Sequence, residues 1–161
     1  KRYLPLGSIV SGTMLLMDVV PALLGAASDV RMSAGDRRTV RRLQAEWDAL
    51  PDADDWNGDQ YHQASDVNSE LHDVLESYAP PYCCLRSHEG DGADLGVWVD
   101  WDRLNEDADE VCQPGGLLKM DAGDPFPPTA SCDYVLVVND HGNATLYGRS
   151  GRRWVELWGC V

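Results

Sequence analysis

The stretch from Cys132 to Val161 constrains the fold more than any other part of the chain. It contains three short runs rich in β-branched and aromatic residues, at 134–138, 144–147 and 154–161. Residues that tolerate positive φ separate the first two runs (139–143), and Ser150-Gly151 separates the last two. Alternating runs joined by such turns predict a three-stranded antiparallel meander at the C-terminus.

Upstream of the meander, the apolar residues follow helical spacing in three segments. Thr13 or Asp18 is expected to cap the first predicted helix, and Asp18 is preferred because Pro21 then falls in the first turn. Ser33 and Asp36 resemble a capping box before the second, which Pro51 ends. The third is expected to begin at Ser65 or Asp66 and to run to about residue 78, so that 51–64 is predicted to be a loop.

Between these helices and the meander, short strands are predicted at 82–86 and 95–99, with a loop at 87–94 between them. Asp100 is the expected N-cap of a short helix that reaches about residue 108 and points Leu104 inward. Residues 114–131 contain three glycines and four prolines without periodicity, which indicates a surface loop. Helices followed by strands predict one α+β domain over residues 1–161, with N-terminal helices packed on a mostly antiparallel sheet of about five strands. Four tryptophans near the strand segments are expected to join the core between sheet and helices: Trp98, Trp101, Trp154 and Trp158.

The charge of the chain is strongly negative and unevenly placed. The formal net charge is −14, from 13 basic and 27 acidic residues. Between Glu46 and Glu110 there are 19 acidic residues and only two basic ones, Arg86 and Arg103. This balance argues against direct binding of nucleic acid through phosphates and against docking on anionic membranes. It favours a partner protein with a basic surface, although an acidic face that only interacts with solvent remains the alternative.

One group of acidic residues is the candidate for partner binding. Several of its members recur at helical spacing in the third predicted helix, so that they form a row on its polar side. The group is Asp52, Asp54, Asp55, Asp59, Asp66, Glu70, Asp73 and Glu76. Arg37, Arg38, Arg41 and Arg42 line the polar face of the preceding helix, where they either pair with this acidic neighbourhood or bind an anion.

Two polar loops are the candidates for metal binding. The first contains His88, Asp91 and Asp94 among glycines, and such oxygen ligands in a flexible loop suit a hard divalent cation. The second contains Asp140 and His141, which could also act as an acid–base pair. A divalent-metal site, or a metal-dependent hydrolase, requires the two loops to meet. The alternative is that both are ordinary turns, in which Asp and Asn side chains bond to their own backbone.

The cysteines and apolar runs bear on location. Five cysteines with no CxxC pair signal neither a disulfide framework nor a thiolate zinc site, and reduced thiols are expected. No apolar run has the length of a membrane span or the form of a secretory signal. The sequence also has no P-loop, GxGxxG or GxSxG motif. A cytoplasmic, non-enzymatic protein without cofactor is therefore the expectation, with the metal-dependent hydrolase as the alternative.

Three motifs together resemble a family of small acidic proteins of bacteriophages and mobile elements that has no assigned activity. They are YLPLG followed by GTM near the start (3–7 and 12–14), SHEGDGADLGVW in the middle (87–98), and VVNDHGNATLY followed by WVELW near the end (137–147 and 154–158). The resemblance implies a cytoplasmic protein in a host cell. By analogy with small phage proteins of this size and charge, it also implies inhibition of a host defence nuclease through a DNA-mimicking surface.

Overall fold

The computed structural model describes residues 2–52, 55–109, 111–129 and 131–160. Its secondary structure is mixed, which confirms the α+β class. The chain divides into two compact units, Lys1–Trp98 and Val99–Val161, and each is described by itself below. The prediction of a single α+β domain over residues 1–161 stays a prediction.

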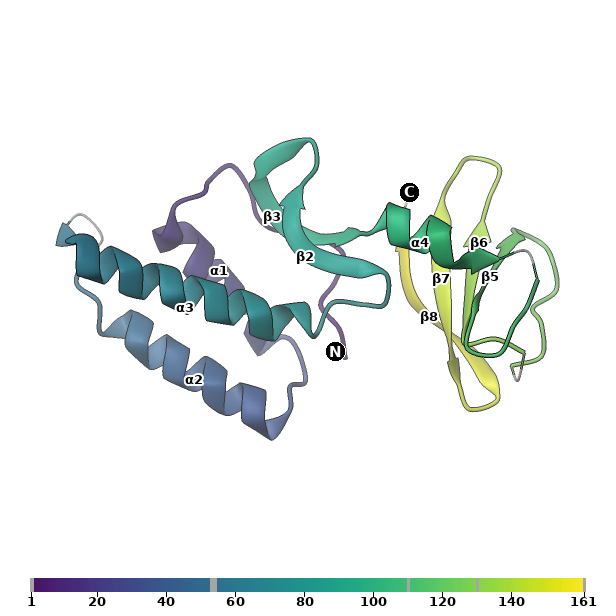
Figure 1. Ribbon diagram of the computed structural model, residues 1–161, viewed down its shortest axis with the longest axis horizontal. Coiled ribbons are helices and arrows are strands. Elements are labelled where there is room, and N and C mark those ends of the chain that lie inside the picture. The colour runs from purple at the N-terminus through teal and green to yellow at the C-terminus, as the bar shows by residue number, and fades with distance from the viewer. Residues whose placement is uncertain (1, 53–54, 110, 130, 161) are drawn as a thin grey trace. The chain divides into compact units, whose positions relative to one another are not determined.

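The first unit combines a layer of three helices with a small sheet (Figure 1). Helix α3 contacts both α1 and α2, and the sheet contacts the helices through β1 and β2. Strand β3 lies between β1 and β2. The elements are β1 (Gly7–Val10), α1 (Leu16–Ser28), α2 (Ala34–Asp48), α3 (Gly58–Glu76), β2 (Cys83–His88) and β3 (Asp91–Val99).

The core of this unit consists of the apolar stripes of the three helices packed on residues from the sheet. Leu23, Leu71 and Leu75 are fully buried, and Leu85 and Val97 meet them from β2 and β3. The spacing of four residues between Leu71 and Leu75 places both on the inner side of α3. The opposite side of α3 therefore faces solvent.

Two predicted helix starts are wrong. Helix α1 begins at Leu16, and Asp18 lies in its first turn, where its carboxylate accepts a hydrogen bond from the Thr13 hydroxyl at 2.7 Å. Helix α3 begins at Gly58 rather than after Ser65 or Asp66. The backbone N–H groups of its first turn are satisfied by a capping box in which Asn57 and Gln60 each accept from the other's backbone. A capped start offsets the polar composition that had indicated a loop.

The predicted cap of α2 is confirmed, and it forms part of a junction with α3. The Ser33 hydroxyl accepts from the Asp36 N–H, and the Tyr78 hydroxyl beyond the end of α3 accepts from the Ser33 N–H at 2.9 Å. The same Tyr78 hydroxyl donates to the Asp36 carboxylate at 2.6 Å. Donation by Tyr78, and then by Ser33, holds the pKa of Asp36 below its usual value.

The small sheet depends on one close backbone approach. Gly96 in β3 pairs with Ser8 in β1, and a Cβ atom at Gly96 would lie 2.3 Å from the Gly7 carbonyl oxygen. Only glycine fits at this distance. The predicted loop at 87–94 is wrong in extent, because β2 runs to His88 and β3 starts at Asp91, which leaves Glu89 and Gly90 as the turn.

The second unit is a five-stranded sheet with one short helix. Its strand order is β4-β5-β6-β7-β8, in which β4–β5 and β5–β6 are parallel and β6–β7 and β7–β8 are antiparallel. The antiparallel run confirms the predicted C-terminal meander. The elements are α4 (Trp101–Asp107), β4 (Ala108–Asp109), β5 (Leu117–Asp121), β6 (Tyr134–Val138), β7 (Ala144–Ser150) and β8 (Arg153–Cys160).

The details of this unit follow from its sequence except in one segment. The Asp100 side chain caps α4 by accepting from the Arg103 N–H, and Leu104 is buried, as predicted. In β7, Ala144 and Leu146 are buried on the inner side, as the alternation requires. The prediction of a loop over 114–131 is wrong for Leu117–Asp121, since this run is a strand paired in parallel with β6. Of the four tryptophans expected in the core, Trp158 is buried, but Trp101 is 43% exposed.

None of the five cysteines forms a disulfide bond in the structure. Two of them lie side by side in the second unit, with the Sγ atoms of Cys112 and Cys132 2.9 Å apart. Burial, followed by the neighbouring Cys112 thiol, raises the pKa of Cys132 to about 12. Cys132 is therefore protonated at any physiological pH.

Candidate functional site

Helix α3 carries a line of free carboxylates, here called the acidic face, that consists of Asp59, Asp66 and Asp73. All three residues are exposed, and their side chains form no hydrogen bond or ion pair with a described residue. They recur every seven residues, so each lies two helical turns from the next on the same side of the helix. Asp52 and Asp55 are exposed in the segment before α3, whereas Asp54 lies outside the described residues.

Two other members of the predicted acidic group have structural partners. Glu70 forms an ion pair with Arg42, whose guanidinium also bonds to Glu46 at 2.7 Å. The hydrogen bond to Glu70 makes the largest contribution to raising the pKa of Arg42, and the hydrogen bond to Glu46 adds to it. Glu76 accepts a hydrogen bond from the Leu85 N–H at 2.6 Å, which ties the end of α3 to β2. Glu70 and Glu76 therefore connect α3 to α2 and to β2, and the free part of the row is shorter than the sequence predicts.

The arginines of α2 pair with the acidic neighbourhood less than the sequence predicts. Arg42 makes the contacts described above. Arg37, Arg38 and Arg41 are exposed and have no hydrogen-bonded or ionic partner among the described residues. The helical layer of the first unit therefore presents free charges of both signs, negative on α3 and positive on α2.

The first predicted metal loop is occupied by local contacts. The Asp91 carboxylate accepts from the Ala93 N–H, and His88 Nδ1 accepts from the Gly90 N–H. The His88 ring also packs edge-on against Trp98, with the ring centroids 4.7 Å apart. Asp94 Oδ1 is buried and has no hydrogen-bond partner among the described residues. These contacts match the turn alternative rather than a set of ligands that converge.

The second predicted metal loop is also a turn. The Asn139 side chain accepts from the N–H groups of His141 and Asn143, and Gly142 takes a positive φ of 82°. Asp140 and His141 are highly exposed, and His141 Nε2 lies 3.7 Å from Asp140 Oδ1. The two loops belong to different compact units. Across the described part of the chain, no three His, Cys, Asp or Glu residues are grouped so that they could hold a metal ion.

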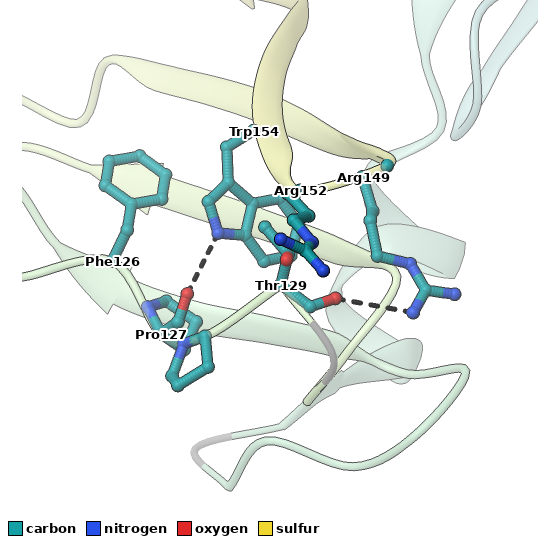
Figure 2. A pocket seen from close by; sticks show the side chains of 8 residues that line it. Phe126, Pro127, Thr129, Arg149, Arg152 and Trp154 are labelled. Atoms are coloured by element: carbon teal, nitrogen blue, oxygen red, sulfur yellow. Dashed lines mark hydrogen bonds between the residues drawn. The ribbon is translucent and has the colours of Figure 1, made fainter.

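The second unit contains a pocket that sequence patterns did not predict. It has a volume of about 670 Å³ and is lined by a proline-rich segment and by the end of the β7–β8 hairpin (Figure 2). The lining residues are Phe126, Pro127, Pro128, Thr129, Arg149, Gly151, Arg152 and Trp154. A PFPP run and a GRSGRRW run, about 20 residues apart in sequence, were the available signals, but nothing in the sequence shows that they meet.

Comparisons with known proteins identify no relative. No protein-family model, no curated protein and no solved structure matches the chain. Among the residues that the structure describes, no helix is long and apolar enough to cross a membrane.

Proposed function

We propose that this protein is a non-enzymatic binding protein whose acidic face engages a basic surface on a partner protein. The observation that carries the proposal is the line of unpaired carboxylates at Asp59, Asp66 and Asp73 on α3. At 1.5 Å of rise per residue, the line spans roughly 21 Å. The buried leucines on the inner side of α3 fix the helix, so the charges are held in place before a partner binds.

Electrostatics makes such a face suited to fast and selective association. Exposed charges attract a complementary surface from a distance of about one Debye length, roughly 8 Å at physiological salt. Each exposed ion pair contributes only about 0.2–1 kcal/mol, so a row of charges steers encounter more than it sets affinity. The net charge of −14 adds a long-range field of the same sign.

A narrower form of the proposal concerns the kind of partner. A groove that normally holds nucleic acid presents lysines and arginines in rows, and a row of carboxylates is complementary to it. In that case the protein is a phage or mobile-element protein in the host cytoplasm that inhibits a defence nuclease. This form is supported by the motif resemblance and by the negative charge. Asp52 and Asp55 would extend the acidic face at its N-terminal end.

The test is a charge-matched comparison of affinity capture from bacterial lysate. The test variant carries three substitutions on the acidic face, Asp59→Asn, Asp66→Asn and Asp73→Asn. The control variant removes the same charge from exposed sites in the second unit, through Asp102→Asn, Asp121→Asn and Asp140→Asn.

A partner retained by the wild type and by the control, but lost from the acidic-face variant, is the expected result. Its affinity, measured with the purified partner, should fall steeply as salt rises from about 0.05 to 0.5 M. Equal retention by both variants, or binding that salt does not change, would refute the proposal.

A further inference from the structure

The pocket in the second unit is open to solvent, and its aromatic walls contact each other and the proline-rich segment. The Trp154 indole N–H donates to the Pro127 carbonyl oxygen at 3.0 Å, which joins β8 to the proline-rich segment (Figure 2). Phe126 packs edge-on against Tyr147 at 4.9 Å and lies 6.3 Å from Trp154, with an angle of 38° between the two planes. Phe126 remains 42% exposed. These contacts fix two aromatic rings while one of them keeps an open surface.

The charge of the pocket is opposite to that of the chain. Its lining residues include two arginines and no carboxylate. Arg149 is held by Asp133 at 2.6 Å and by the Thr129 carbonyl oxygen at 3.3 Å, so it fixes the wall. Arg152 is exposed and has no hydrogen-bonded or ionic partner among the described residues. A free guanidinium therefore stands at the rim of an aromatic pocket in a protein of net charge −14.

We propose that this pocket binds a nucleotide, with its base against Phe126 and Trp154 and its phosphate at Arg152. Every nucleobase has a flat π-face that can stack on an accessible aromatic ring. Guanidinium is the preferred protein group for phosphate. A volume of about 670 Å³ lies within the usual range for small-molecule sites. Recognition by side chains does not require the glycine-rich loops that the sequence lacks.

The nucleotide could be free or part of a single strand, and the two sources share the same chemistry. The negative charge of the whole chain opposes binding of a polyanion, because every additional phosphate meets the same unfavourable field. A free mononucleotide has a single phosphate group, which would lie beside Arg152. We therefore expect a free nucleotide to bind, and we expect a single strand to bind no more tightly than the nucleotide despite its additional phosphates.

The experiment uses calorimetric titration of the full chain with adenosine monophosphate, adenosine, inorganic phosphate and a short single-stranded oligonucleotide. The test variant is Arg152→Gln. Arg153→Gln is its matched control, because Arg153 is the adjacent exposed arginine and does not line the pocket. Both sites are on the surface, so neither variant should disturb folding, and circular dichroism checks this.

Adenosine monophosphate is expected to bind more tightly than adenosine or phosphate alone. Arg152→Gln should weaken it by about tenfold, and Arg153→Gln by less than about twofold. Tighter binding of the oligonucleotide with the same Arg152 dependence would support the same chemistry with a single strand as the source. Absence of binding, equal effects of the two variants, or equal affinity for inorganic phosphate alone would overturn the proposal.

Discussion

The junction between α2 and α3 gives the sharpest test of how the first unit is held together. In Tyr78→Phe, the Ser33 N–H loses its acceptor and the Asp36 carboxylate loses a donor. A neutral hydrogen bond contributes about 1 kcal/mol and one to a charged group about 1.5–3 kcal/mol. Because water can reach these groups in the variant, the expected loss of unfolding free energy is about 2 kcal/mol.

Urea denaturation followed by circular dichroism measures this loss, and pH supplies a second readout. The pKa of Asp36 is lowered in the folded state, so its bonds stabilise the fold above the unfolded pKa of about 3.9 and are lost as pH falls through the folded value. The effect of Tyr78→Phe should therefore be full at neutral pH and shrink below about pH 4. In an Asp36→Asn background, the effect should be smaller at neutral pH and independent of pH in the acid range.

Tyr61→Phe is the matched control. Tyr61 lies on α3, the helix that ends just before Tyr78, is 55% exposed, and its hydroxyl has no hydrogen-bond partner among the described residues. Its substitution should change stability by less than about 0.5 kcal/mol. If Tyr78→Phe costs no more than Tyr61→Phe, or costs as much at pH 3 as at pH 7, the bridging role of the Tyr78 hydroxyl is refuted.

Three further outcomes are expected. Gly96→Ala should lower the free energy of unfolding by about 3 kcal/mol or more in urea denaturation, because its Cβ would meet the Gly7 carbonyl oxygen at 2.3 Å. Gly92→Ala has open space and should lower it by under about 1 kcal/mol. Equal losses for the two variants would contradict this reasoning. At mildly alkaline pH, oxidised glutathione should form a mixed disulfide with Cys112 and release one reduced glutathione. Cys132, whose Sγ atom lies 2.9 Å away, should then displace the second glutathione. Peptide mass spectrometry should find this pair ahead of any other, and preferential formation of another pair would refute the reasoning. Mg²⁺, Mn²⁺, Ca²⁺ and Zn²⁺ should leave the melting temperature of the metal-free protein unchanged, and a clear rise with any of them would revive the metal-binding alternative.

The local elements of the fold could be read from the sequence where a periodic pattern and a cap agree. The stripe of Val67, Leu71 and Leu75 predicted α3, and Asp100 predicted the start of α4. The start of α3 was missed because its first turns are polar, although Asn57 and Gln60 carried the capping signal. The strand β5 was missed because its five residues, which include the charged Lys119 and Asp121, lie between glycines and prolines and are too few to show a clear period.

The acidic candidates show a similar division. Helical spacing was sufficient to place Asp66 and Asp73 on one side of α3, because a helix fixes neighbours by their separation in sequence. Asp59 joins them only because α3 begins at Gly58, ahead of its predicted start. It could not show that Glu70 and Glu76 have partners, since those partners are Arg42 on another helix and the Leu85 backbone on a strand. Which carboxylates remain free is decided by tertiary contacts.

The sequence by itself therefore determined the α+β class, the C-terminal meander, the helical stripes and the negative charge, since all of these depend on local spacing and composition. Only the tertiary structure decided that the two histidine-containing loops are local turns in different units. It also decided that Pro127 and Trp154 meet to form a pocket. Contacts between distant residues depend on how elements pack, and packing is set by the fit of many side chains at once rather than by any one motif.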